Sequence, residues 1–146
     1  NGSYTLPDSP YSFAAHVVVV EVSRDTGQVS ILRYVGVHDG GRIINPMLGE
    51  GQIHGGIAQG IGQALTEGMV YTPDGQPITA SLMDYALPRA STIPDLFMEN
   101  IETPSPTNPL GAKGVGSVST VPAPVAVANA VLDALSDRGC ATSILH

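Results

Sequence analysis

The sequence predicts an α+β domain of two layers, with a mixed β-sheet and two main helices. Three observations predict this class: two β-branched segments near the start, two segments with helical patterning further on, and no regular strand–helix alternation or internal repeat in the sequence. A length of 146 residues suits one domain. We therefore expect residues 1–146 to form a single domain, with its core over about 13–135.

The first predicted element is a long antiparallel hairpin. Residues Phe13–Ser23 are compact and β-branched, Arg24–Gly27 have the composition of a turn, and Val29–His38 resume a strand pattern. The following residues, Asp39–Pro46, read as a loop, and the Asn-Pro pair at its end is typical of a turn or a helix start.

The next segment, Met47–Glu67, combines a helical pattern with many glycines. Isoleucine and leucine recur every four residues from Ile53 to Leu65, which marks one apolar face of a helix. Each interior glycine costs about 0.5–1 kcal/mol relative to alanine, so an element must approach the backbone closely to offset this. Two explanations stay open: tight packing against another element of the chain, which we favour, or a cofactor lying on the glycine face.

Shorter elements are predicted downstream, ending in an Ala/Val-rich helix with proline near its first turn. Three prolines in 103–109 exclude a helix or a central strand there. The predicted order is a short hairpin of 69–71 and 77–79, strand or extended segments over 82–87 and 96–102, the proline loop, and a helix over 122–135.

A second glycine-rich segment, Gly111–Ser117, precedes this last helix. Backbone N–H groups of such a loop can hold an anion, with Lys113 adding charge. The spacing matches neither a Walker A loop nor a dinucleotide fingerprint. From the residues alone, a structural turn is favoured over an anion site.

Composition excludes several functions. The net charge is −7 with no Lys/Arg cluster, which argues against nucleic-acid binding. The single cysteine, Cys140, excludes an internal disulfide and a cysteine-rich metal site, and suits a reducing compartment, so we expect a cytoplasmic protein. No apolar stretch approaches the length of a membrane span. The histidines His16, His38 and His54 lack metal-ligand spacing and are expected to be ordinary packed or surface residues.

Five segments, in this order, resemble the molybdenum hydroxylases, the family of xanthine dehydrogenase, aldehyde oxidase and carbon monoxide dehydrogenase large subunits. The resemblance covers about residues 13–135 and corresponds to the C-terminal part of the molybdenum-binding chain of that family. The segments are VHDGGRIINP (37–46), EGQIHGGIAQGIGQAL (50–65), SLMDYALPRA (81–90), ETPSPTNPLGAKGVG (102–116) and PAPVAVANAVLDAL (122–135).

The resemblance implies a molybdenum–molybdopterin cofactor, in bacterial members often as a cytosine dinucleotide, held without protein ligands to the metal. It also implies oxidative hydroxylation of an aldehyde or N-heterocycle, or carbon monoxide oxidation. The implied partners are the remaining molybdenum-binding domains and iron–sulfur and flavin domains or subunits. The implied cofactor contacts are Gln59, Gly60, Lys113, Gly114, Val115, Gly116 and Ser117.

At two positions the sequence departs from this pattern. Ser117 occupies the position of the catalytic glutamate of the family, and Gly40 occupies a position usually filled by cysteine. A serine hydroxyl with no adjacent base does not serve as a general base near neutral pH. We therefore assign no catalytic residue and expect the chain by itself to be inactive.

Two further interpretations stay open: a stand-alone, non-catalytic remnant that keeps the fold, and an interaction domain whose glycine surfaces serve packing. For a domain outside its larger subunit, we also expect self-association through surface that its neighbours would cover.

Overall fold

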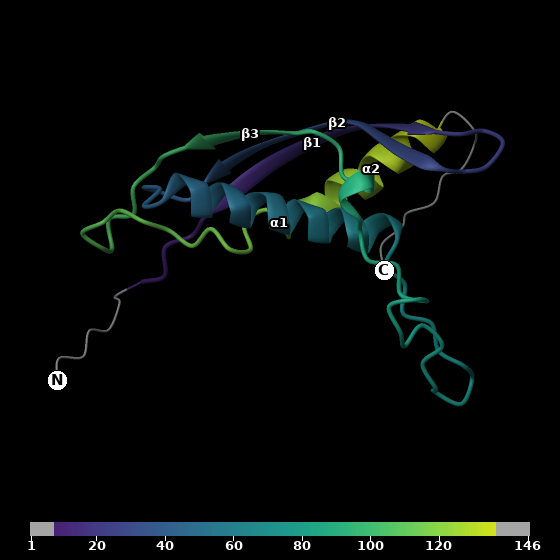
Figure 1. Ribbon diagram of the computed structural model, residues 1–146. Coiled ribbons are helices and arrows are strands. Elements are labelled where there is room, and N and C mark those ends of the chain that lie inside the picture. The colour runs from purple at the N-terminus through teal and green to yellow at the C-terminus, as the bar shows by residue number, and fades with distance from the viewer. Residues whose placement is uncertain (1–7, 137–146) are drawn as a thin grey trace.

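The computed structural model describes residues 8–136 and has two layers, a three-stranded sheet and a pair of helices under one face of it (Figure 1). The strand order is β1-β2-β3, with β1 antiparallel to β2 and β2 parallel to β3. The sheet is therefore mixed, and the predicted α+β class with two main helices is confirmed. None of the helices in residues 8–136 has both the length and the apolar character that a membrane span requires.

The predicted hairpin is present as β1 (Phe13–Val22) and β2 (Val29–Asp39). Exposure alternates along β1, as it does in a strand that covers a core with one face only. A register shift between Val19 and Val20 marks a bulge. The third strand, β3 (Leu96–Ile101), pairs with the second half of β2, from Tyr34 to Asp39.

The glycine-rich segment forms one long helix, α1 (Pro46–Leu65). The Asn45 side chain accepts a hydrogen bond from the N–H of Leu48 at 3.2 Å, and proline occupies the start of the helix, where it removes no intrahelical bond. The predicted apolar stripe lies in the core, where Ile53, Ile57 and Ile61 pack with Tyr34 and residues of the second helix.

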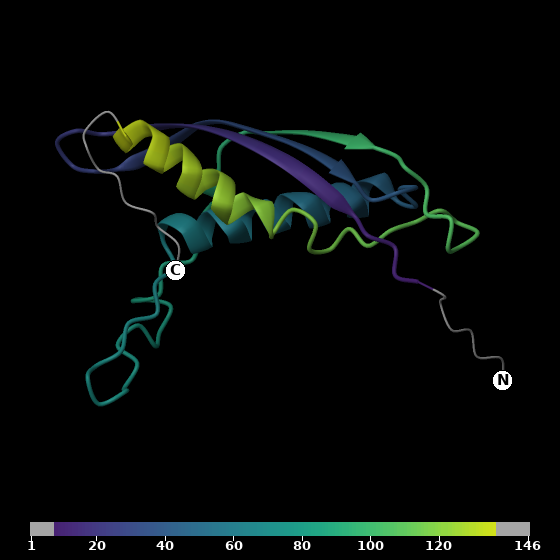
Figure 2. The same cartoon turned by 180° about the vertical axis from the view of Figure 1, so that it is seen from behind.

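The second helix, α2 (Pro122–Ser136), and the residues before it lie against the face of α1 that carries Gly56 and Gly60 (Figure 2). A Cβ atom on Gly56 would meet the hydroxyls of Ser119 and Thr120, and a Cβ atom on Gly60 would meet Ala123 and Pro124. Packing within the chain therefore explains these two glycines. It does not explain Gly51 and Gly55, which have no atom of the described chain within 4 Å of a Cβ position.

Between α1 and β3 the chain leaves the body as an arm, residues 66–89, which projects below the helix layer (Figure 1). The predicted hairpin at its tip is reduced to one isolated bridge between Tyr71 and Pro77. The strand or extended segment expected over 82–87 begins instead as a turn, because the N–H groups of Asp84 and Tyr85 donate to the carbonyl of Ser81. A short 3₁₀ turn, η1 (Ala90–Thr92), leads back to the sheet.

Candidate functional site

The glycine loop, residues 111–117, is pinned to the residues that follow β2. The N–H of Arg42 donates to the carbonyl of Gly111, and the N–H of Lys113 donates to the carbonyl of Gly40, both at 2.9 Å. Gly41 and Gly111 both have positive φ, 63° and 68°, a backbone conformation that favours glycine. The two segments thus approach each other backbone to backbone, and this fixes where the loop begins.

The carboxylate of Asp39, at the end of β2, is fully buried beneath this contact. Its oxygens accept hydrogen bonds from the N–H of Gly41 at 2.7 Å, the N–H and hydroxyl of Thr103, and the ammonium of Lys113 at 3.1 Å. Burial by itself raises the pKa of Asp39, but these hydrogen bonds outweigh burial and lower the pKa to about 2. The side chain is therefore an ionised partner for Lys113 at neutral pH.

Beyond Lys113 the backbone of the loop has free hydrogen-bond donors. Within residues 8–136, the N–H groups of Gly114, Val115, Gly116 and Ser117 donate to no acceptor. Gly114, Gly116 and Ser117 are exposed, and a Cβ atom on Gly114 would meet nothing within 4 Å. Successive unpaired N–H groups on an exposed loop suit an anion or another strong acceptor.

A shallow cleft of about 210 Å³ lies beside the loop. Its walls come from three segments: the loop, residues 42–45, and the first turns of α1, from which Leu48, Gly49 and Gln52 line it. Of the predicted contacts, Lys113 and Val115 line the cleft. The glycine loop thus has an open concavity next to it, which the side chains of residues 8–136 leave unfilled.

The other predicted contacts lie further along α1. Gln59 is exposed, whereas Gly60 is buried against Ala123 and Pro124. Neither residue lines the cleft beside the loop. Gln59 and Gly60 therefore stay predictions as cofactor contacts.

A chain of hydrogen-bonded side chains that no sequence motif indicates lies between the sheet and the helices. His16 bonds through Nδ1 to the hydroxyl of Tyr34 at 2.7 Å and through Nε2 to Nε2 of His38 at 2.8 Å. Nδ1 of His38 is the buried side-chain atom without a partner among the described residues. The register of the predicted hairpin could have revealed the pair of histidines. Ala14 is paired with His38 and His16 with Gly36, which places both histidine side chains on the same face of the sheet.

Burial lowers the pKa of His16 to about 4, with the nearby charge of His38 adding to the effect. Burial also lowers the pKa of His38, and the charge of His54 contributes. The pair is therefore neutral near pH 7. Within residues 8–136, no group of three His, Cys, Asp or Glu side chains could hold a metal ion. Cys140 lies outside the described residues.

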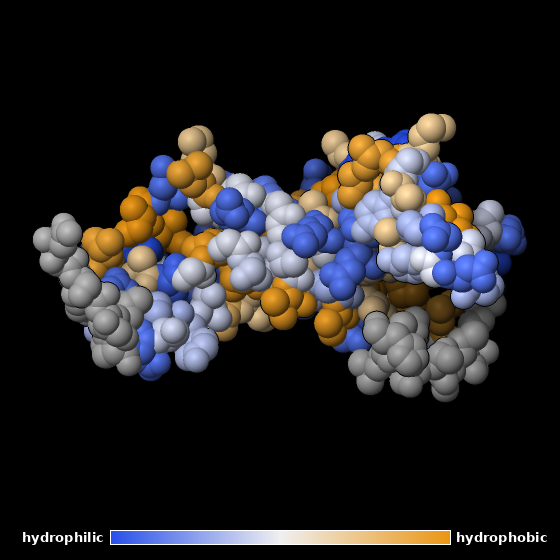
Figure 3. All heavy atoms as spheres, turned by 90° about the horizontal axis from the view of Figure 1, so that it is seen from below, coloured by the Kyte–Doolittle hydropathy of each residue, from blue (hydrophilic) through white to orange (hydrophobic). Residues whose placement is uncertain are grey.

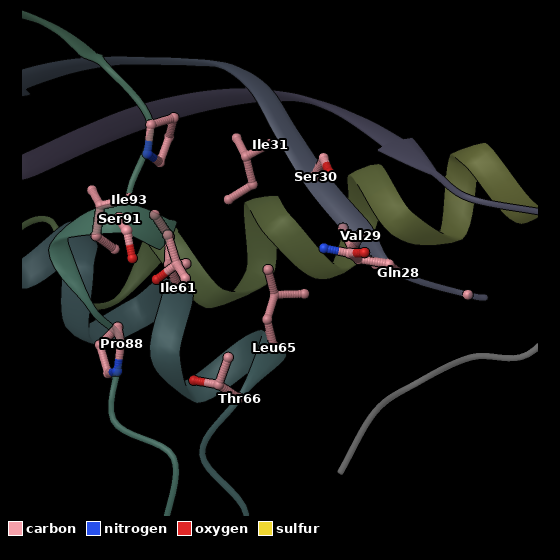
Figure 4. Close-up of a pocket in the computed structure, with 13 residues that line it drawn as sticks. Gln28, Val29, Ser30, Ile31, Ile61, Leu65, Thr66, Pro88, Ser91 and Ile93 are labelled. Carbon is pink, nitrogen blue, oxygen red and sulfur yellow. The ribbon is translucent and has the colours of Figure 1, made fainter.

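A larger cavity of about 590 Å³ lies at the far end of α1, between the β1–β2 turn and residues 88–94 (Figure 4). Side chains of Ile31, Ile61, Leu65 and Ile93 face it together with those of Gln28 and Ser91. Among residues 8–136, those that line it have no titratable side chain. This cavity therefore offers no group for acid–base or metal chemistry.

Comparison with known proteins identifies a family. A family profile described as a molybdopterin cofactor-binding domain matches residues 1–94. The chain is 45% identical over 129 residues to the 6-hydroxypseudooxynicotine dehydrogenase complex subunit gamma of Paenarthrobacter nicotinovorans, covering 87% of this chain and 16% of that protein. It is 38% identical to the carbon monoxide dehydrogenase large chain of Hydrogenophaga pseudoflava, covering 93% and 17%.

Solved structures of related enzymes have a similar fold. Quinoline 2-oxidoreductase from Pseudomonas putida 86 matches with a TM-score of 0.81 and 45% identity, over 84% of this chain and 16% of that one. A Cu,Mo-CO dehydrogenase matches with a TM-score of 0.88 and 36% identity, over 92% and 17%. The chain thus spans about one sixth of the length of the relatives it matches.

Proposed function

The chain belongs to the family of molybdopterin cofactor-binding domains, and from this membership we propose that it forms the cofactor-binding portion of a larger molybdenum-dependent oxidoreductase. The observation that carries the proposal is the run of four N–H groups, Gly114 to Ser117, that have no acceptor in the described part of the chain and lie beside an open cleft. These donors suit a cofactor rich in acceptor oxygens, and the phosphates of a dinucleotide form suit them best.

A second feature of the described residues fits such a group. Gly51 and Gly55 leave an open strip along the exposed side of α1, where nothing in the described chain explains the missing side chains. A metal carried by the cofactor's own sulfur atoms would need no ligand from the protein. When bound, the group supplies the redox centre for hydroxylation with water as oxygen source.

In the proposal, this chain's residues bind and orient the cofactor. Backbone N–H groups of Gly114–Ser117 donate to it, and the exposed amide of Gln59 contacts it along α1, whereas Gly60 is buried against α2 and supports this helix from behind. The relatives named after nicotine and quinoline favour a nitrogen heterocycle as the substrate of the complete enzyme. A cytoplasmic location is part of the same proposal and suits the single cysteine.

Catalytic competence is a separate part of the proposal. The hydroxyl of Ser117 is exposed and has no hydrogen-bond partner among residues 8–136, so no neighbouring base activates it there. We propose that the chain binds the cofactor without supplying a general base. The alternative, a remnant that keeps the fold without cofactor, predicts the same lack of activity but no molybdenum.

The surface supports a place inside a larger assembly. The sheet face opposite the helices exposes Val17, Val19 and Phe97, and the arm exposes Leu82 and Met83 at 80% and 95%. Seen from the helix side, further apolar groups reach the surface between polar ones (Figure 3). We propose that the remaining molybdenum-binding domains, in an assembly with iron–sulfur and flavin domains or subunits, cover these surfaces.

The test is cofactor loading. The complete protein, produced with molybdenum and the cofactor's biosynthetic enzymes, should contain molybdenum and pterin in a fixed ratio to the chain. Gly55→Leu should lower both contents at least about tenfold by filling the open strip, while thermal stability is kept or raised because leucine favours the helix. Ala134→Leu, which adds a side chain at an exposed position of α2, is the matched control and should load normally. A wild-type protein without molybdenum and pterin would favour the remnant.

A further inference from the structure

Three segments that are distant in sequence meet at one carboxylate. Asp39 ends β2, Thr103 follows β3, and Lys113 stands inside the glycine loop. Both oxygens of Asp39 are used: Oδ1 accepts from the N–H groups of Gly41 and Thr103, and Oδ2 accepts from the Thr103 hydroxyl and the Lys113 ammonium. The Asp39 side chain has no exposed surface, and the Lys113 side chain has 10%.

The ammonium of Lys113 is bound by groups of the protein itself. Its ammonium donates to Asp39 at 3.1 Å and to the hydroxyl of Thr103 at 2.7 Å, and it lies 5.3 Å from the centre of the Phe13 ring. An outside anion would have to compete with a buried carboxylate for this ammonium, which would leave that carboxylate without its cation. A lysine held in this way is poorly suited to act as a direct ligand.

We propose that Asp39 is a positioning residue that holds Lys113 inward and thereby presents the backbone N–H groups of Gly114–Ser117 to the cofactor. The ion pair acts as a latch on the loop, and the N–H groups do the binding. That these N–H groups bind a cofactor rests on the proposed function. That the Asp39–Lys113 pair holds the loop in place rests only on the contacts between these residues.

A rival role for Lys113 makes the opposite prediction. If its positive charge bound the cofactor directly, replacing Asp39 with a neutral residue would free the ammonium and keep or strengthen binding. If the pair is a latch, the same change leaves Lys113 without its counter-ion, so the loop shifts and binding weakens.

The first experiment measures the latch without reference to cofactor. Peptide-resolved hydrogen–deuterium exchange is compared between the complete wild-type protein and Asp39→Asn. The amides of Arg42 and Lys113, which bond across the two segments, should exchange about 10²-fold faster, whereas the amides shared by β1 and β2 keep their protection. Glu50→Gln is the control, because Glu50 lies in an exposed pair with His54, 3.9 Å apart, and should change neither. Unchanged exchange at Arg42 and Lys113, or equal acceleration throughout the domain, would overturn the latch.

The second experiment measures molybdenum and pterin content in the same variants. Asp39→Asn should lower loading at least about tenfold, and the double variant Asp39→Asn/Lys113→Met should regain exchange protection at Arg42, because it leaves no buried charge without a partner. Wild-type or higher loading in Asp39→Asn would overturn the positioning role in favour of direct binding by Lys113. If wild-type protein takes up no cofactor while the exchange result holds, the proposed function fails and the latch stands.

Discussion

The imidazole of His16 is hydrogen-bonded to that of His38, Nε2 to Nε2 at 2.8 Å, above the bare Cα of Gly36. Only one of the two nitrogens can carry the shared proton. If both rings were protonated, two N–H groups would face each other and the bond would be lost. The pair is therefore compatible with the fold only while it is not doubly charged.

This arrangement predicts a loss of stability at mildly acidic pH. Both histidines have a pKa below the ordinary value of 6.5, His16 at about 4, so the unfolded chain binds more protons than the folded one between those values. Stability is complete above pH 6.5 and falls as the pH drops toward 4, by at most about 1.4 kcal/mol per pH unit for each histidine. Denaturant titrations at several pH values measure this slope.

The variant His16→Gln removes one titrating ring and should reduce the dependence of stability on pH between pH 6.5 and 4. A flat profile in this range in wild-type protein would contradict the neutral buried pair.

A second loss of stability is expected below pH 4, since the pKa of Asp39 is about 2 instead of 3.8 and its ionised form stabilises the fold.

Gly36→Ala should destabilise the domain, because the new methyl group would enter the histidine pair. Its Cβ would lie 2.9 Å from Cε1 of His38, 3.0 Å from Sδ of Met98 and 3.1 Å from Cδ2 of His16. Crowding of this kind costs about 1–3 kcal/mol. Urea denaturation measures the loss, and Gly114→Ala, which meets no atom within 4 Å, should stay within about 0.5 kcal/mol of wild type.

The glycines of α1 should respond in opposite directions to alanine. Gly55→Ala should raise the free energy of unfolding by about 0.5–1 kcal/mol, since it gains helix propensity and meets no atom. Gly60→Ala should lower it by about 1–3 kcal/mol, because the methyl group would collide with Ala123 and lie 2.8 Å from Cδ of Pro124. Equal effects of the two changes would show that α2 does not lie against Gly60.

The 146-residue chain studied apart from any larger subunit should self-associate. Its outer sheet face exposes Val17, Val19 and Phe97 by about half or more of their surface, with no covering layer in the described chain. Sedimentation velocity at micromolar concentration should show species larger than a monomer, and Val17→Lys with Val19→Lys should shift them toward the monomer. A clean monomer in the wild-type sample would contradict this prediction.

Ser117→Glu, made in the same 146-residue chain, should not produce turnover. The substitution places a carboxylate at an exposed position of the loop whose residues Lys113 and Val115 line the cleft, and in the proposed function further domains complete the cofactor site. A general base contributes about 10²–10⁴ in rate, but only when substrate and cofactor are held against it. Assays with aldehydes, purines and carbon monoxide test this, and measurable oxidation of any of them would contradict it.

The sequence by itself determined the elements of this fold and its family. β-branched runs, an isoleucine repeat of four residues and Asn45-Pro46 are local signals, so the hairpin, α1 and α2 were predictable to within a few residues. The glycine loop was also visible, but not its hydrogen-bonding state. The sequence did not predict the turn within 82–87, where we expected a strand or extended segment, because short apolar segments with little pattern do not distinguish a strand from a turn.

Only the tertiary structure decided which glycines serve packing and where the charge of Lys113 goes. Gly55 and Gly56 are adjacent in sequence, yet one faces open space and the other the hydroxyls of Ser119 and Thr120. Asp39 and Lys113 are separated by 74 residues, and their contact depends on the path of all the chain between them, which includes α1 and β3. Such contacts depend on chain segments brought together by folding, and no spacing within one segment encodes them.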